Sequence, residues 1–330
     1  MIPSAAGLRQ TAVAVQVAGA LGCAGLLINL ADWPWYAALA GGVLIVLALF
    51  ALTVALAFAV TLSGFGTGGT LALPPAAVAL RRETAPLGPW RALSCYAHEC
   101  VAVFRMFNWL QPFRSGVPVA AEPTNALGVP RPPLLLVHGY GCNHAIWLDM
   151  LPALAAAGYR CEAIDLEPVL GDIDDDGRAL LARIDTIHQR EGRAPLLLCH
   201  SMGGLAARAA LARARERGVP APCAGIVTLG TPHRGCALAR YGSGINATQM
   251  RCGSGWLSAL ATAETARERA RMVSVFSWHD SIAGPPGTAW LEGARHVALS
   301  GVGHVSLLRD AGATRAALEA LAGLEVSGPG

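Results

Sequence analysis

One serine stands where an apolar run gives way to small residues. Residues 196–204 read LLLCHSMGG, with Ser201 directly after the apolar run. A sharp strand-to-helix turn of this kind, a nucleophile elbow, presents the serine hydroxyl above a sheet. The turn needs small side chains two positions before and after the serine. Gly203 meets that need, whereas Cys199 replaces the usual glycine. We predict that Ser201 is a nucleophile; the alternative is a simple helix cap.

A serine nucleophile needs a base that removes its proton and an acid that orients the base. Asp280 lies in the motif SWHDSI, and His304 follows in GVGHVSLL. The chain order serine, aspartate, histidine is the one found when such a triad is built on a parallel sheet. We therefore predict that Ser201 attacks an acyl carbon, His304 transfers its proton, and Asp280 orients the imidazole.

Other polar residues compete for these roles less well. His279 neighbours Asp280 but would point elsewhere on an extended segment, and His296 lies within an apolar run. Asp310 suits a helix start. The remaining candidates lie inside loop motifs and are expected to hold loop hydrogen bonds: His138, His200 and His233.

Acyl transfer also needs backbone N–H groups directed at the developing oxyanion. The motif LLLVHGYGC, residues 134–142, ends an apolar run in a glycine-containing loop. We predict that the oxyanion hole is formed by the N–H groups of Tyr140 and Met202, the residue after the candidate nucleophile. The acidic run at 172–176 invites a calcium interpretation, but it precedes a helical stretch, and we favour helix capping.

The elements that must position these residues alternate between strand and helix. This alternation predicts a mostly parallel sheet with helices on both faces, and chemistry at the carboxyl ends of the strands. The predicted strands are Leu134–Val137, Arg160–Asp165, Leu196–Cys199, Gly225–Leu229, Met272–Ser277 and His296–Leu299. The predicted helices lie near 145–157, 178–191, 202–217 and 311–322.

The first part of the chain has a different composition. Between Arg9 and Arg81 the only charged residue is Asp32, and Trp35–Leu62 carries none. A 28-residue helix would be about 42 Å long, enough to cross a hydrocarbon core of about 30 Å. Thr11–Ala31 is a weaker second span. We predict a transmembrane hairpin at 1–64; one span or a cleaved signal peptide are the alternatives.

Between hairpin and sheet, 65–130 is predicted to hold a linker and an amphipathic segment, and 131–330 the catalytic domain. The linker is expected at 63–94, which is rich in Gly, Pro and Thr. Cys95–Phe113 would lie on the bilayer or pack on the domain. Ala237–Arg271 is longer than a simple crossover, so it is either a mobile cap over the site or a surface excursion.

Charge and cysteine content exclude several classes. The net charge is +3, and the arginines are scattered, which argues against nucleic-acid binding. The nine cysteines show neither metal-ligand nor disulfide-framework spacing, so most are expected to be core residues in a reducing compartment. We expect no metal ion.

Six motifs together resemble those of bacterial lipases and esterases of the triacylglycerol lipase type, in the α/β-hydrolase superfamily. They are VHGYGCNHAIW, IDLEPVLGDIDD, LLCHSMGGLAAR, TLGTPHRG, SWHDSI and GVGHVSLL. The resemblance covers roughly residues 132–322. It implies an α/β-hydrolase fold, the triad and oxyanion residues named above, and cofactor-free hydrolysis of carboxylic esters. Cys199, and Cys236 after Pro-His-Arg-Gly, depart from the family pattern.

The leading prediction is thus a membrane-anchored serine carboxylesterase or lipase that acts on lipophilic esters, with membrane lipid as its surroundings and protein partners unspecified. A thioesterase or acyltransferase would use the same triad. A non-catalytic scaffold is the third alternative, against which the complete triad argues. Arg9 before the hairpin, and Arg81, Arg82 and Arg91 after it, predict a multi-pass protein of a bacterial inner membrane with a cytoplasmic catalytic domain.

Overall fold

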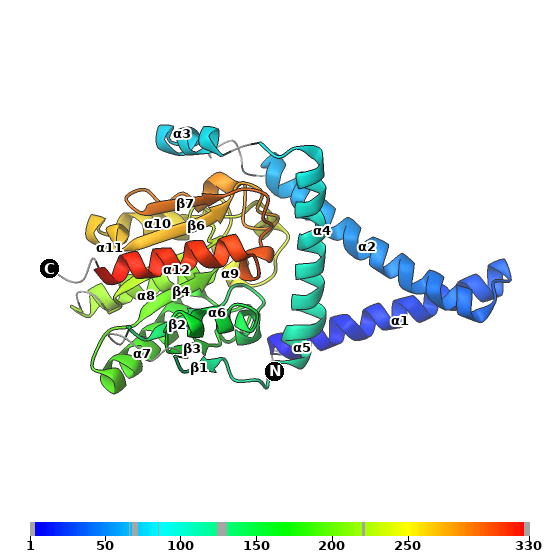
Figure 1. The fold of residues 1–330 in the computed structure, drawn as a ribbon, viewed down its shortest axis with the longest axis horizontal. Helices are drawn as coiled ribbons and strands as arrows, with labels where there is room; N and C mark the ends of the chain where they lie inside the picture. Colours follow the sequence, from blue (N-terminus) through cyan, green and yellow to red (C-terminus); the bar gives the residue numbers. More distant parts are fainter. Residues whose placement is uncertain are drawn as a thin grey trace.

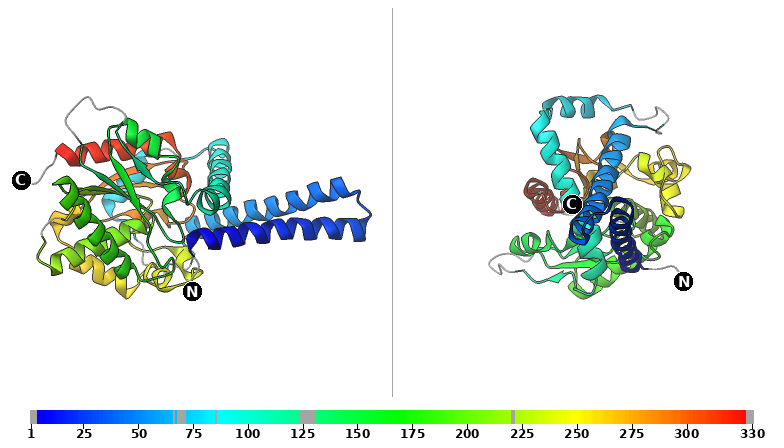
Figure 2. Two further views of the ribbon diagram at one scale, coloured as in Figure 1. Left: turned by 90° about the horizontal axis from the view of Figure 1, so that it is seen from below. Right: turned by 90° about the vertical axis from the view of Figure 1, so that its right-hand side faces the viewer.

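The computed structural model describes residues 4–65, 67, 72–84, 86–123, 131–219 and 222–326. Parts of the predicted linker segment 65–130, and both ends of the chain, lie outside the described residues. The protein consists of a layered α/β domain from which two long helices project (Figures 1 and 2).

The centre of the domain is a sheet with the strand order β1-β3-β2-β4-β5-β6-β7, parallel except for β1. The six predicted strands are confirmed to within one residue at each end. The short antiparallel β1 was not predicted. The strands are β1 (Ala120–Ala121), β2 (Leu134–Val137), β3 (Cys161–Ile164), β4 (Leu196–His200), β5 (Gly225–Leu229), β6 (Met272–Ser277) and β7 (Arg295–Leu299).

Helices cover both faces of the sheet. Successive side chains of each strand point to opposite faces, and both faces are apolar, so each needs a covering layer. Leu134 and Leu136 share one apolar cluster with α6 (Leu151–Ala156) and α12 (Ala311–Val326). Leu135 shares the other with α7 (Ile173–Glu191) and α8 (Gly203–Glu216). The helix predicted at 145–157 is instead two pieces, η2 (His144–Trp147) and α6, which begins with a proline in its first turn.

The N-terminal part is a helical hairpin of α1 (Ala5–Ala31) and α2 (Trp35–Ser63). The two helices meet at a tip far from the sheet (Figure 1). Both are long and apolar enough to cross a membrane, and most of their surface is exposed in the protein. Gly42 allows them to approach closely, since a Cβ there would come within 2.2 Å of the Ala20 carbonyl oxygen.

A further helix crosses the base of the hairpin (Figure 1). It comprises α4 (Pro89–Arg105), a π-helical stretch η1 (Met106–Leu110) and α5 (Gln111–Phe113). Its buried residues recur every three or four positions and face the domain: Cys95, Glu99, Ala102, Met106 and Leu110. Its other side exposes an apolar row: Trp90, Leu93, Val101, Phe104, Trp109 and Phe113. The segment predicted to be amphipathic therefore packs on the domain with one face and leaves an apolar face uncovered.

The stretch predicted to be a linker contains regular structure. The helix α3 (Pro75–Glu83) lies within 63–94, and Leu80 packs against Phe276 and Trp278 beside β6. Proline in its first turn starts the helix, a position where the missing N–H has no cost. Gly and Pro content alone predicted a linker here and overlooked this local helix signal.

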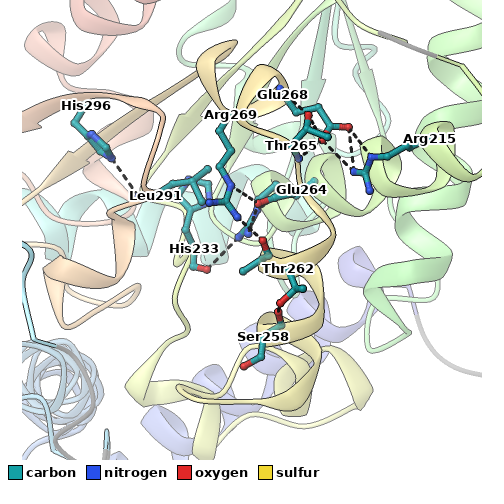
Figure 3. A network of polar contacts seen from close by, with 12 residues as sticks. Arg215, His233, Ser258, Thr262, Glu264, Thr265, Glu268, Arg269, Leu291 and His296 are labelled. Atoms are coloured by element: carbon teal, nitrogen blue, oxygen red, sulfur yellow. Dashed lines mark hydrogen bonds and ion pairs between the residues drawn. The ribbon is translucent and has the colours of Figure 1, made fainter.

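The segment Ala237–Arg271 holds η3 (Ala237–Arg240), α9 (Ile245–Gln249), α10 (Gly255–Ala263) and α11 (Ala266–Ala270). Ion pairs tie its second half to α8 (Figure 3). Arg208 Nη2 lies 2.9 Å from Glu264 Oε2, with both side chains almost fully buried. Arg215 pairs with Glu268 at 3.0 Å. Two short turns complete the domain, η4 (Pro286–Ala289) and η5 (Ser306–Leu308).

Candidate active site

Ser201 occupies a strained turn between β4 and α8. Its φ is 55°, a left-handed conformation that is uncommon for residues other than glycine. The turn is held from both sides, because the Ser201 N–H donates to Leu229 O at 2.9 Å and Thr231 Oγ1 donates to Ser201 O at 2.7 Å. A Cβ at Gly203 would lie 2.6 Å from the His138 carbonyl oxygen, so this position requires glycine. These features are those of a nucleophile elbow.

Cys199 fits the elbow without exposing its thiol. It is fully buried in the apolar cluster below the sheet. Burial raises the pKa of the Cys199 thiol well above its usual range. The sulfur is therefore a protonated core group, which accounts for the departure from glycine at this position.

Asp280 and His304 meet beside the elbow. His304 Nδ1 lies 2.8 Å from Asp280 Oδ2, and Asp280 Oδ1 accepts hydrogen bonds from the N–H groups of Ile282 and Ala283. Burial alone would lower the pKa of His304. The charge and hydrogen bond of Asp280, with the charge of Glu99, outweigh burial, so the pKa is raised above its usual value of 6.5. The structure thus brings the predicted acid and base together.

Ser201 and His304 line the same cavity, which has a volume of 140 Å³. Within the described chain, no hydrogen bond joins the Ser201 hydroxyl to His304. Catalytic hydrogen bonds are often long in the absence of substrate. The rest of the cavity wall is mostly apolar and includes Phe107, Ile146 and Leu308.

The two predicted oxyanion donors are near the elbow. In the part of the chain that the structure describes, the backbone N–H groups of Tyr140 and Met202 have no hydrogen-bond acceptor. A Cβ at Gly139 would lie 2.7 Å from Ser201 Cβ, so glycine lets this loop approach the serine closely. His138 Nδ1 donates to Gly139 O at 2.9 Å and fixes the loop, as expected for a loop histidine.

The competing histidines have partners other than Asp280 and Ser201. His279 accepts the Gly301 N–H, and His296 accepts the Leu291 N–H and stacks on Trp290. His200 Nε2 donates to His304 O at 3.2 Å, and burial lowers the pKa of His200 well below its usual value, so it stays neutral. Asp310 caps α12 by accepting the Ala313 N–H, as predicted.

Glu99 is a component of the site that the sequence did not reveal. It projects from α4, is fully buried, and reaches the loops that carry Asp280 and His304. Oε1 accepts from Ser281 Oγ at 2.5 Å and from the Val305 N–H at 2.9 Å. Oε2 accepts from the Ser306 N–H at 2.9 Å and Ser306 Oγ at 2.7 Å. A single carboxylate from the N-terminal segment therefore binds both loops.

Both ends of the hairpin also contact the site. Arg9 of α1 lines the cavity, and its Nη2 donates to Gly141 O at 3.0 Å. Thr61 of α2 donates to Ser281 O at 3.0 Å. The sequence signal for Arg9 and Glu99 was a charge on an otherwise apolar helix face. That signal alone did not predict that either residue contacts the site.

The acidic run is a helix cap. Asp172 accepts the Asp174 N–H at the start of α7 and receives Gln249 Nε2 at 2.6 Å. Among the described residues, no group of three or more His, Cys, Asp or Glu side chains could hold a metal ion. All nine cysteines are free, and six of them are buried, as expected for core residues.

Residues 134–325 match the family model described as "Alpha/beta hydrolase family". Among solved structures, the mature lipase BlEst2 of Bacillus licheniformis is 21% identical, with 58% of this chain and 94% of that chain covered and a TM-score of 0.50. Lipase B of Aspergillus fumigatus is 16% identical, with 62% of this chain and 56% of that chain covered and a TM-score of 0.49. The monoacylglycerol lipase of Paleococcus ferrophilus is 18% identical, with 59% of this chain and 96% of that chain covered and a TM-score of 0.43.

No curated protein matches the sequence. The matches to solved structures concern the fold, and they cover only part of this chain. The family match spans more than half of the chain and includes the elbow and the acid and base loops. The chain therefore belongs to the α/β hydrolase family, as its motifs predicted.

Proposed function

We propose that the protein is a membrane-anchored serine carboxylesterase or lipase that hydrolyses lipophilic carboxylic esters through an acyl-serine intermediate. One observation carries the proposal. Ser201, on its strained elbow, shares a cavity with His304, which is hydrogen bonded to Asp280 at 2.8 Å.

In the acylation step, Ser201 Oγ attacks the ester carbonyl carbon while His304 Nε2 takes the hydroxyl proton. The carbonyl oxygen becomes an oxyanion, which the N–H groups of Tyr140 and Met202 stabilise. Asp280 holds the Nδ1–H of the imidazole and stabilises its charged form. The ester C–O bond then breaks, and His304 gives its proton to the departing alcohol oxygen.

Deacylation repeats this sequence with water as the nucleophile. His304 removes a proton from the water as it attacks the acyl-serine carbonyl. The second tetrahedral intermediate collapses, the bond to Ser201 Oγ breaks, and His304 returns the proton to the serine. The products are a carboxylic acid and an alcohol, and the enzyme is restored.

The proposed membrane anchor is supported by surfaces that the domain leaves uncovered. α1 and α2 expose large apolar side chains along most of their length. The apolar row on α4–α5 lies beside the base of this hairpin (Figure 1). A helix that binds the domain with one face and exposes aromatic residues on the other suits the membrane–water interface. Both hairpin ends contact the site, so the cavity would draw its substrate from the bilayer.

We place the catalytic domain on the cytoplasmic side of a bacterial inner membrane. A two-helix hairpin returns the chain to the side on which it started, and the flanking arginines favour the cytoplasm. Nine free cysteines suit a reducing compartment. A reporter that is active only in the periplasm should give no signal when it is fused to the C-terminus of the protein. A strong signal would refute this orientation but not the chemistry.

The activity is tested with the full-length protein in detergent micelles. The wild type should react with a fluorophosphonate probe and hydrolyse nitrophenyl esters, and a series of acyl chain lengths defines its preference. Ser201→Ala should abolish labelling and reduce turnover by roughly 10³-fold or more. Ser254→Ala, at the N-cap of α10, is the matched control and should label normally. Normal labelling of Ser201→Ala would refute the proposal.

A further inference from the structure

The cavity beside Ser201 has mostly apolar walls, and Arg9 is the one arginine among the residues that line it. Its apolar lining comes from Met106, Phe107, Ile146, Ile282, Val305 and Leu308. Arg9 reaches this cavity from the first turns of α1. Its guanidinium lies over the Phe107 ring, 4.0 Å from the ring centroid. Ester hydrolysis itself does not need a cation here, because the oxyanion donors are backbone groups.

Arg9 has few polar partners. Nη2 donates to Gly141 O, whereas Nε is buried and has no hydrogen-bond acceptor. Within the described residues, no carboxylate forms an ion pair with Arg9. The two buried carboxylates of the site have other partners, since Asp280 binds His304 and two backbone N–H groups, and Glu99 binds four donors.

A partly shielded guanidinium without a counter-charge is costly, because one hydrogen bond and one contact with an aromatic ring replace only part of its hydration. A bound anion would offset that cost. The guanidinium presents several N–H donors in a planar fork that matches the oxygens of a phosphate. An unpaired arginine in a cavity beside a nucleophile is therefore a binding group for an anionic part of the substrate.

The position of Arg9 identifies the anion. It lies at the end of α1 next to the catalytic domain, which is the end at the membrane surface if α1 spans the bilayer. Phosphate groups of phospholipids lie at this level. In a glycerophospholipid only a few bonds separate the phosphate from the nearer acyl ester, so one small cavity can accept both.

We propose that Arg9 binds the phosphate of a glycerophospholipid whose acyl ester is cleaved at Ser201, so that phospholipids are preferred to neutral glycerides. This inference rests on the proposed ester hydrolysis and adds its substrate class. Arg9 acts in binding and selection, and the reaction steps at Ser201 are unchanged.

The test compares two soluble esters with the same acyl chains, dihexanoyl phosphatidic acid and dihexanoylglycerol, both below their critical micelle concentrations. The full-length enzyme should favour the phosphate ester. Arg9→Gln should lower kcat/KM for that ester about 10- to 100-fold more than for the neutral ester, mainly through KM, because only the phosphate ester loses a charged partner. Arg9→Lys should retain part of the preference. The exposed Arg114→Gln controls for general surface charge.

Other outcomes would overturn the inference. An equal loss on both esters would mean that Arg9 only supports the loop at Gly141. A wild type without preference, whose cleavage of the neutral ester is inhibited by inorganic phosphate through Arg9, would make the site one for free phosphate. If Arg9→Gln does not fold, as judged by fluorophosphonate labelling, Arg9→Lys must still show a selective loss on the phosphate ester. A wild type that neither labels nor cleaves either ester would refute both proposals.

Discussion

Replacement of Glu99 by glutamine tests whether the N-terminal segment takes part in catalysis. The substitution preserves shape but removes the charge and turns one acceptor oxygen into an NH₂ group. Each Glu99 oxygen accepts one backbone N–H and one hydroxyl. The hydroxyls can rotate to accept, but one N–H, of Val305 or of Ser306, must then face another donor.

The expected loss can be estimated from that orphaned donor. A hydrogen bond to a charged group contributes about 1.5–3 kcal/mol, and a buried donor left unpaired costs a similar amount. His304 precedes Val305 directly, so relief of this conflict moves the base. If the whole cost falls on the transition state, kcat decreases roughly 10- to 150-fold. Substrate binding, which does not involve Glu99, should change little.

A second effect separates positioning from general damage. The Glu99 charge helps to raise the pKa of His304. Without it, the imidazole should lose its proton at lower pH, so the acid limb of the kcat/KM profile should move to lower pH even as kcat falls. The assay is nitrophenyl ester hydrolysis across the pH range, with the outward-facing neighbour His98→Gln as the matched control. Wild-type kcat and an unmoved acid limb in a folded Glu99→Gln enzyme would refute the reasoning.

Three further outcomes are expected. Cys199→Gly should keep ester turnover within about threefold and cost about 1–2 kcal/mol of stability, because it removes a buried side chain; inactivity comparable to that of Ser201→Ala would contradict this. Because the pKa of His304 is raised and the base must be neutral, wild-type kcat/KM should fall as the pH drops through a value above 6.5, and an acid limb below 6.5 would argue against His304 as the base. Glu264→Gln should lower the free energy of unfolding by about 3 kcal/mol, since Arg208 is left buried beside a neutral amide. Glu216→Gln, in an exposed ion pair, should lower it by less than about 0.5 kcal/mol. Equal denaturation midpoints for these two variants would show that the buried pair does not stabilise the segment.

The sheet was predictable because its strands are buried on both faces. Such strands appear in the sequence as continuous apolar runs, and the six runs identified correspond to β2–β7 within one residue. The site motifs follow directly from this, because they lie where those runs end. β1 is two residues long and was not predicted, since so short a strand depends on its partner β3 rather than on its own sequence pattern.

The contacts between the N-terminal segment and the site were not predictable in the same way. Glu99 is 181 residues before Asp280 in the chain, and Arg9 is 132 residues before Gly141. Local periodicity shows which side of α4 is apolar, but not which loops that side covers. Only the tertiary arrangement shows that a carboxylate within the buried face of α4 accepts hydrogen bonds from the base loop.

This arrangement gives the N-terminal helices a role beyond the proposed attachment to a membrane. The family match begins at residue 134, yet side chains from before that residue reach the loops around Ser201. Arg9 donates to Gly141, Thr61 donates to Ser281, and Glu99 joins the loops that carry Asp280 and His304. Buried hydrogen bonds of this kind depend on geometry, so displacement of the hairpin relative to the domain would shift the loops. If the hairpin spans a membrane as proposed, its insertion and the alignment of Ser201, His304 and Asp280 are coupled, which would favour activity at the membrane where the proposed substrates lie.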